Sequence, residues 1–506
     1  MGGMIRPWRL LASLFVVPVL FATACTGSSE EEEAPDQSED EINYRSTAGQ
    51  EFELSTTITF KLSAETQALQ GAEKEAAVNL QATSLRTTVT GAISADLDKL
   101  WPEADRLKKT SAAVQLRQPT ASFRDLKPSN DGTSYTLTIV GEFGGTKDLE
   151  RRLPLETVDG KTFLPVTTDI GNGPQELQVF VKAIERSRNA YPKYMELFED
   201  GLDIGVHLGG DHNDPPKDID HARSVYDDLV ASGFKSPVTK FEDLKIDSGA
   251  LTSAIKVKGK TVPVRVKIFH VDMSTPDTRQ LVIDAYKASM KSADVVIYDG
   301  HAGRRLDYSG VVLAYKPARA SVTANEFKSI ESTAKQQVYL FNGCETYTGY
   351  ADKVYENPNR NPGNTDIITT VNYSAIQSKA NQVIAFIHSF IDQKAGNWIP
   401  RSWDGVLSKM NAVGERSWVH VYGVHGLDDN PKLSPLADVS KIGQECTTDA
   451  QCGAADSKCI LGTGSRRVCG VACADTGGCP TGTKCILPRS TSAVTATPDD
   501  QQCVRQ

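Results

Sequence analysis

The chain has 506 residues and a net charge of −9 at pH 7, and 24% of its residues are charged and 7% aromatic. These fractions are ordinary for a globular protein, and at about 150 residues per domain the length predicts roughly two to four domains. Because the acidic balance offers no basic footprint for a phosphate backbone, we expect no nucleic-acid partner.

Residues 1–24 have the features of a targeting segment that is removed during export. Two arginines precede an apolar stretch at residues 10–22, which is short and interrupted by a proline and is therefore a poor membrane span. Small residues then lead into Cys25 and resemble the end of a bacterial lipoprotein signal, in which this cysteine becomes lipidated. An ordinary secretory signal cut near Ala24 is the alternative. In both cases we expect an exported protein, and a lipid on Cys25 would anchor it in a bacterial cell envelope.

Residues 25–44 are rich in acidic side chains and lack an apolar face, which predicts a disordered tether. Residues 45–190 predict a β-rich accessory domain. Apolar and polar residues alternate over residues 51–62, and a second strand is expected at 134–143 after a turn sequence. A weakly patterned helix is expected near 65–81. This region contains no recognisable catalytic constellation.

Residues 191–435 alternate between strand and helix patterns, which is typical of a parallel sheet with helices on both faces. The expected strands are at residues 202–208, 262–271, 295–298, 338–341 and 418–426. The expected helices are at residues 218–232 and 275–291, after the capping pair Thr323 and Glu326, and at 379–393. A hairpin is expected at residues 304–315.

Two of these strands end in turns that carry reactive side chains. Residues 293–303 run from an apolar strand into a glycine-bearing turn with His301, and residues 337–349 do the same with Cys344. Neighbouring parallel strands bring such turns together at their C-terminal ends, where open α/β sheets place their ligands. A thiol and an imidazole that meet there can form a nucleophile–base pair.

The positions of the 10 cysteines separate Cys344 from the rest. Apart from the lipidation candidate Cys25, the others lie in residues 440–506 and predict a small disulfide-rich module of an exported protein. They are Cys446, Cys452, Cys459, Cys469, Cys473, Cys479, Cys485 and Cys503. Cys344 then remains as either a buried inert thiol or a reactive one, and its place at a strand end opposite His301 favours the reactive thiol.

The cysteine-rich module contains an internal repeat. The first three cysteines have the spacing Cys-x5-Cys-x6-Cys, which the similar spacing Cys-x5-Cys-x5-Cys from Cys473 to Cys485 echoes, and each set ends in a Cys-Ile pair. Because no Cys-x2-Cys pair is present and no histidine follows His425, we expect no zinc site. Eight cysteines allow about a hundred pairings, so the sequence leaves the connectivity open. The composition suggests a role in adhesion or protection at the cell surface.

The two turns resemble those of the clan CD cysteine peptidases, which include caspases, legumains, clostripain and gingipains. The shared order is strand-x-Gly-His-x-Gly, then a helix, then strand-x-Gly-Cys. The order of elements and the separation of 344 − 301 = 43 residues are also similar, and residues 196–213 resemble gingipain-type sequences. The resemblance covers about residues 203–428. Two positions depart from the family: Ala302 stands where members usually have glycine, and Gly343 stands where many have alanine.

The resemblance implies a caspase-like α/β fold in which Cys344 is the nucleophile and His301 supplies protons. It also implies an oxyanion hole that is built from the backbone N–H groups of Cys344 and of Ala302 or Gly303. Chemistry of this kind requires no metal and no cofactor.

Four side chains are candidates for a substrate pocket: Asp211, His212, Asp299 and Glu345. The first two belong to an acidic cluster after the first strand of residues 191–435. Such a cluster can favour a basic substrate residue, bind a cation or form a solvated loop, and the sequence leaves these alternatives open.

We therefore expect an exported, lipid-anchored cysteine endopeptidase that cleaves peptide or protein substrates through a thioester acyl-enzyme. Two alternatives stay open. One is an inactive peptidase-like surface lipoprotein that serves as a binding or structural module. The other is an esterase or transpeptidase that uses the same Cys-His pair.

Overall fold

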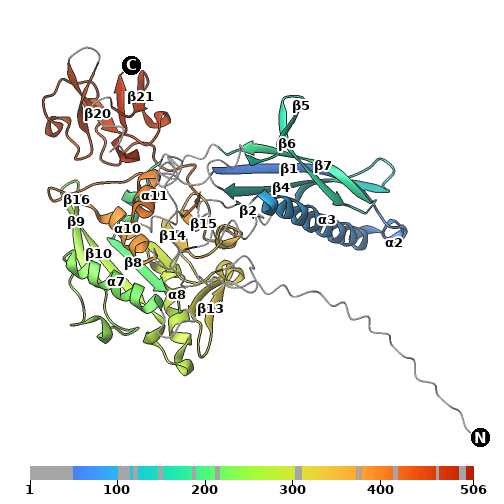
Figure 1. The fold of residues 1–506 in the computed structure, drawn as a ribbon, viewed down its shortest axis with the longest axis horizontal. Helices are drawn as coiled ribbons and strands as arrows, with labels where there is room; N and C mark the ends of the chain where they lie inside the picture. Colours follow the sequence, from blue (N-terminus) through green and yellow to red (C-terminus); the bar gives the residue numbers. More distant parts are fainter. Residues whose placement is uncertain are drawn as a thin grey trace, which may run out of the picture.

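The structure is a computed structural model with three successive folded parts (Figure 1). It describes residues 50–100, 114–117, 123–145, 152–171, 173–184, 190–210, 217–302, 310–371, 374, 379–413, 420–462, 466–488 and 497–505. The predicted targeting segment and acidic tether lie outside the described residues, and so does the lipidation candidate Cys25.

The N-terminal domain is a seven-stranded antiparallel sheet in the order β2-β4-β1-β7-β6-β5, with β3 also paired to β4. The strands are β1 (Gln50–Lys61), β2 (Val114–Arg117), β3 (Phe123–Pro128), β4 (Ser134–Gly145), β5 (Glu156–Val158), β6 (Lys161–Asp169) and β7 (Pro174–Ala183). Both strands predicted in this region are present, as β1 and β4. The alternation in β1 places Phe52, Leu54 and Ile58 inside, whereas Glu53 and Thr57 are exposed.

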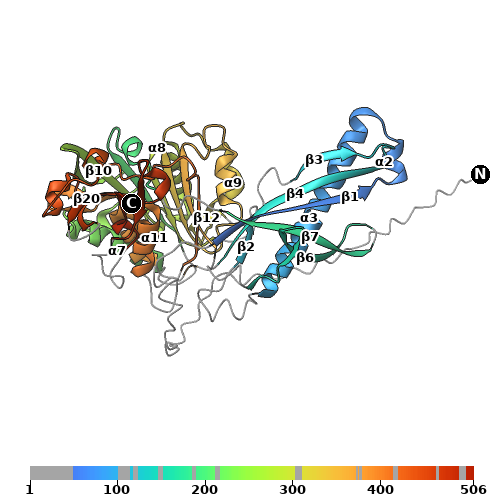
Figure 2. The ribbon, with the colours of Figure 1, turned by 90° about the horizontal axis from the view of Figure 1, so that it is seen from above.

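A long helix, α3 (Gly71–Leu100), covers one face of this sheet (Figure 2). Its buried side chains recur at three- and four-residue spacing and are Val78, Ala82, Leu85, Val89, Ile93 and Leu97. A short helix, α2 (Ala64–Ala68), precedes it. The prediction stopped near residue 81 because the second half of α3 contains Gly91 and several β-branched residues, which lower helix propensity. Packing against the sheet outweighs that preference.

The central domain is built on a seven-stranded mixed sheet in the order β18-β15-β14-β11-β8-β10-β9. The strands are β8 (Leu202–Leu208), β9 (Leu251–Val257), β10 (Lys260–Phe269), β11 (Val295–Asp299), β14 (Gln337–Asn342), β15 (Thr365–Thr370) and β18 (Tyr422–His425). The five inner strands are parallel, as the alternating pattern predicted, and the edge strands β9 and β18 are antiparallel to their neighbours.

Helices cover both faces of the central sheet. They are α6 (Tyr194–Leu197), α7 (Lys217–Ala231), α8 (Gln280–Ser292), α9 (Tyr350–Tyr355), α10 (Lys379–Ile391) and α11 (Trp403–Ala412). Side chains of β11 alternate between two cores. Val295 and Ile297 belong to the core of α7, α10 and α11, whereas Val296 and Tyr298 belong to the core of α8 and α9. Every side chain of β11 is therefore buried, which matches its continuous apolar sequence.

Several elements of the central domain differ from the prediction. Residues 304–309 of the expected hairpin lie outside the described residues, and the rest of it forms β12 (Gly310–Ala314), which pairs with β13 (Ala320–Thr323). The capped segment that follows is a 3₁₀ helix at Ala324–Ser329. A small hairpin of β16 (Gln393–Lys394) and β17 (Asn397–Trp398) follows α10. β9, β15, α9 and α11 were not predicted from the sequence. β9 forms a tight hairpin with β10, whereas β15 is paired with strands that lie farther away in the sequence.

The C-terminal module is a four-stranded sheet in the order β19-β20-β22-β21. Its strands are β19 (Lys458–Leu461), β20 (Arg467–Ala472), β21 (Thr483–Ile486) and β22 (Gln502–Arg505). Four disulfides staple it: Cys446–Cys459, Cys452–Cys469, Cys473–Cys485 and Cys479–Cys503. In each half the first cysteine joins the third and the second joins the fourth, so the predicted internal repeat is confirmed in the connectivity.

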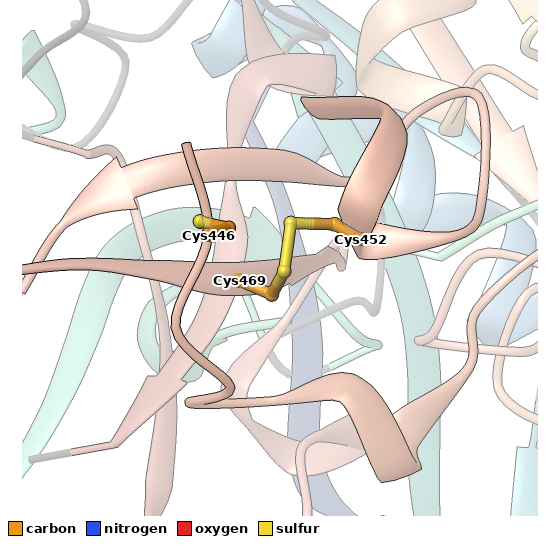
Figure 3. Close-up of side chains that lie close together, drawn as sticks. All are labelled: Cys446, Cys452 and Cys469. Carbon is orange, nitrogen blue, oxygen red and sulfur yellow. A yellow bond between two sulfur atoms is a disulfide. The ribbon is translucent and has the colours of Figure 1, made fainter. Parts of the chain in front are cut away.

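The disulfides also explain a cluster of sulfur atoms. Cys446, Cys452 and Cys469 bring their sulfurs within 4.8 Å of one another, and Figure 3 shows Cys446 beside the Cys452–Cys469 bond. All three are oxidised and are therefore not thiolate ligands. Such bonds indicate an oxidising extracellular or periplasmic environment. Within the described ranges, no helix has the length and apolar character that crossing a bilayer requires.

A buried carboxylate attaches the C-terminal module to the central domain. Asp499 accepts hydrogen bonds of 2.8 Å from the backbone N–H and from the hydroxyl of Ser402, just before α11, and one of 3.1 Å from Arg401. Burial raises the pKa of Asp499, and the hydrogen bonds from Ser402 and Arg401 oppose that rise. The interior of the module consists mainly of its cysteines, so disulfides and contacts of this kind hold it in place.

A second buried carboxylate makes stability depend on pH. Asp366 of β15 has no exposed surface, and its Oδ2 accepts a hydrogen bond of 3.0 Å from Asn430. Burial raises the pKa of Asp366 to about 8. The folded state therefore binds this proton more tightly than the unfolded chain, in which the pKa is about 3.9. The stability that Asp366 contributes is present below pH 4 and is lost as the pH rises through about 8, with a slope of up to about 1.4 kcal/mol per pH unit.

We expect Asp366→Asn to remove this loss, because an amide keeps the hydrogen bond and does not ionise. The free energy of unfolding in urea, measured from pH 5 to 8, should fall less steeply for the variant than for the unsubstituted chain. Asp392→Asn is the control. Burial alone would raise the pKa of Asp392, but hydrogen bonds from Lys409 and Arg401 outweigh burial and lower it, so it stays ionised over this range. Parallel pH profiles for Asp366→Asn and the unsubstituted chain would contradict the prediction.

Candidate active site

The two predicted reactive turns follow neighbouring strands. β11 and β14 are adjacent and parallel, and Asp299 lies opposite Asn342 at their last paired position. One residue further on, the Gly300 N–H donates a hydrogen bond of 3.4 Å to the Asn342 carbonyl. The predicted adjacency of the two strands is thus confirmed. His301 and Cys344 each stand two residues beyond this last pair, Asp299 and Asn342, so they leave the sheet at the same level of its C-terminal edge.

Ala302 and Gly343 pack against each other between the two turns. A Cβ atom built on Gly343 would lie 2.6 Å from the Ala302 Cβ and 3.1 Å from the Gly300 carbonyl oxygen. Real Cβ atoms do not approach so closely, so the space between the turns holds a single methyl group. Ala302 is not among the described non-glycine residues with a positive φ, so alanine is unstrained after His301.

The Cys344 side chain is buried, with 3% of its surface exposed, and its sulfur is disulfide-bonded. A sulfur in this state is not a thiolate nucleophile, and it becomes one only after reduction. The sequence predicted either a buried thiol or a reactive thiol, and the disulfide contradicts both predictions.

The His301 turn is fixed through its backbone. The Tyr298 hydroxyl donates a hydrogen bond of 2.5 Å to the His301 carbonyl and accepts one of 2.8 Å from the Val312 N–H of β12. Complete burial raises the pKa of Tyr298 well above its ordinary value, so the hydroxyl keeps its proton and remains a donor. The imidazole ring of His301 lies 6.1 Å from the ring of Tyr315, measured between centroids.

Asp299, a predicted pocket residue, lies beneath the edge of the sheet. Its side chain is completely buried, and its Oδ1 accepts a hydrogen bond of 2.8 Å from the Asn342 side chain. Its Oδ2 lies 3.7 Å from Nδ1 of His221 on α7, and the same nitrogen lies 3.7 Å from Asp218. In this position Asp299 ties the two strand ends to each other and to α7, and it offers no surface to a substrate.

The polar network under the edge continues into the helices on the same face. The Asn342 amide lies 3.4 Å from the Gln382 side-chain oxygen on α10, and the Gln382 amide contacts His420. Gln382 and His420 have no exposed surface. Because buried polar groups are costly unless they are bonded, such a network favours one arrangement of the strand ends.

Of the other predicted pocket residues, the structure describes only Glu345. Glu345 follows Cys344 directly, is 6% exposed and has a φ of +55°. A left-handed conformation is uncommon for a residue with a side chain and is held in place by its surroundings. Asp211, His212 and the oxyanion candidate Gly303 lie outside the described residues.

Two buried threonines that the sequence analysis missed support the Cys344 turn. The Thr346 hydroxyl donates to the Phe341 carbonyl and accepts from the Thr370 N–H, each at 2.9 Å. The Thr370 hydroxyl donates to the Gly343 carbonyl. Thr370 ends β15, a strand that the sequence analysis had not assigned. Nothing in the sequence therefore placed this threonine beside Cys344.

The N-terminal domain reaches the same edge at Tyr347. A Cβ atom on Gly144, near the end of β4, would lie 3.0 Å from the Tyr347 ring, and one on Gly423 of β18 would lie 2.4 Å from it. The ring therefore fits between two glycines, one from each domain. In Figure 2 the end of β4 meets the central domain. The N-terminal domain thus contacts the loop that carries Cys344.

Comparison with protein-family models, with curated proteins and with solved structures finds no match.

The contact between the two turns predicts a compensating pair of substitutions. Gly343→Ala alone should destabilise the chain by about 1–3 kcal/mol, because the new methyl group collides with Ala302. Adding Ala302→Gly should restore most of that loss, since the methyl group then moves from one turn to the other. Urea unfolding of the two single variants and the double variant measures the coupling. Additive losses in the double variant would show that the two residues are not in contact.

Proposed function

We propose that the central domain is a cysteine peptidase of exported location that cleaves peptide bonds with Cys344 and His301. The observation that carries the proposal is the pairing of β11 with β14, which brings the Gly-His and Gly-Cys turns to one level of the ligand-binding edge. Close packing of Ala302 on Gly343 supports it, because it holds the two turns together.

The same packing accounts for the two departures from the clan CD pattern. Members of that family usually have glycine after the histidine, and many have alanine before the cysteine. Here the two residues are exchanged, and the space between the turns accommodates one methyl group in either arrangement. Ala302 and Gly343 are thus compatible with a caspase-like site, and the caspase-like fold is part of this proposal.

In the proposed reaction the Cys344 thiolate attacks the substrate carbonyl carbon and forms a C–S bond. The C–N bond breaks, and His301 gives a proton to the leaving amine, a step of the kind that typically contributes about 10²–10⁴-fold. Water then hydrolyses the thioester. The backbone N–H of Cys344, with that of Ala302 or Gly303, stabilises the oxyanion. Peptides or proteins are the substrates, and the reaction needs no metal or cofactor.

The proposal concerns the chain with Cys344 reduced. In the structure this sulfur is oxidised, and a reductant or a thiol exchange partner must convert it to the thiol before it can react. Export as a lipoprotein anchored through Cys25 belongs to the same proposal. The four disulfides of the C-terminal module are consistent with such a compartment.

One observation favours a second candidate function, an inactive peptidase-like module that binds or supports other components at the cell surface. Cys344 is both buried and disulfide-bonded, which is how a structural cysteine behaves.

Labelling with iodoacetamide separates the two functions. The full chain is reduced with a phosphine, labelled from pH 5 to 9 and mapped by mass spectrometry. For the peptidase we expect Cys344 to label well below the ordinary thiol pKa of about 8.5, because a nearby imidazolium stabilises the thiolate. The profile should shift in His301→Ala. It should not shift in His388→Ala, a histidine on α10 that is bonded to Asp228 at 2.6 Å.

Variant Cys344→Ala should lose only the labelled peptide that contains residue 344, because the phosphine also frees the module cysteines, which label as ordinary thiols. A panel of peptides then tests hydrolysis directly. Hydrolysis of esters without hydrolysis of peptides would point to the esterase alternative. If Cys344 labels only after unfolding, the peptidase proposal fails and the binding module replaces it.

A further inference from the structure

The hydroxyl of Thr370 controls the direction of one peptide group at the candidate site. Thr370 has no exposed surface, and its hydroxyl donates to the carbonyl of Gly343. The proton assignment is consistent, because the neighbouring Thr346 hydroxyl gives its own proton to the Phe341 carbonyl. The Gly343–Cys344 peptide is therefore held by a donor on the next strand.

Peptide planarity converts this contact into an orientation of the Cys344 N–H. In a trans peptide the C=O and N–H bonds point in opposite directions. β15, which carries Thr370, lies on one side of β14, and β11 lies on the other. A Gly343 carbonyl turned toward β15 therefore turns the Cys344 N–H toward the turn that follows β11, which contains His301.

The turn needs such support. The left-handed φ of +55° at Glu345 is unfavourable for a residue with a side chain. Conformations of this kind persist only where surrounding contacts over-determine them. The Thr346 and Thr370 hydroxyls make such contacts on both sides of Cys344, at Phe341, Gly343 and the Thr370 N–H.

We propose that Thr370 is a positioning residue that aims the Cys344 N–H at the oxyanion of the reacting carbonyl. This inference rests on the proposed peptidase function. It adds Thr370 to the candidate active site as a residue that does not touch the substrate. Its hydroxyl acts only through the Gly343–Cys344 peptide. An oxyanion forms during attack on a carbonyl but not during displacement at a saturated carbon, so two probes distinguish positioning from general support.

The first probe is p-nitrophenyl acetate, which acylates a cysteine through a tetrahedral oxyanion, and the second is iodoacetamide, which alkylates it without one. Thr370→Val replaces the hydroxyl with a methyl group of similar size. We expect the rate of acylation of the phosphine-reduced full chain to fall on the order of 10-fold to 100-fold, as for a misplaced oxyanion donor. The rate of alkylation should stay unchanged. Thr370→Ser, which keeps the hydroxyl, should restore acylation.

Thr369→Val is the matched control. Thr369 is equally buried on the same strand, but its hydroxyl bonds toward β18, to the Gly423 carbonyl at 3.3 Å and to His425 at 3.0 Å, and not to the Gly343 carbonyl. We expect both rates to be unchanged in this variant, with Cys344→Ala as the background.

Three results would overturn the inference, and they differ in what else they affect. Equal acylation of Thr370→Val and the unsubstituted chain would remove the role of Thr370 and leave the peptidase proposal standing. A parallel fall in acylation and alkylation would assign Thr370 a purely structural role. Absence of acylation in the unsubstituted chain, with Cys344 labelled only after unfolding, would remove both proposals.

Discussion

The candidate site depends on the parallel pairing of β11 with β14 in one register. Asp299 lies opposite Asn342, and a hydrogen bond of 2.8 Å between their side chains joins the pair at the last position of the ladder. A slip of one residue would turn every side chain of a strand to the other face of the sheet. Apolar residues would then meet the wrong core, and His301 would no longer stand level with Cys344. Both cores of the domain therefore help to hold the two turns in place.

Around this pairing, small groups and hydroxyls determine the shape of the edge. The methyl group of Ala302 fills the space beside Gly343. On the opposite side, the Thr346 and Thr370 hydroxyls donate hydrogen bonds to the backbone carbonyls of Phe341 and Gly343. These contacts are directional, so they specify the orientation of peptide groups as well as their position. The Tyr298 hydroxyl does the same for the His301 turn. A site that works through backbone N–H groups requires support of this kind.

The peptidase and the inactive module differ at one sulfur atom. The disulfides of the C-terminal module and the oxidised Cys344 have the same chemistry but different consequences. In the module the bonds replace a hydrophobic core that the segment is too small to form. At Cys344 the bond removes the thiolate on which the proposed reaction depends. The redox state of Cys344 thus decides whether the edge can carry a nucleophilic thiolate or provides only a structural support.

The sequence by itself determined the strands with strong patterns, such as β1, β11 and β14, the alternation of the central domain, the placement of His301 and Cys344 after two of its strands, and the repeat in the module. These features are local, because burial of a strand on one or both faces leaves its own period in the residues. Only the tertiary structure decided that α3 extends to Leu100, that Asp299 is buried under the edge, that Thr370 bonds the Gly343 carbonyl, and that Gly144 packs on Tyr347. Each of these joins residues far apart in the chain, and no local pattern of propensity or period records such a contact.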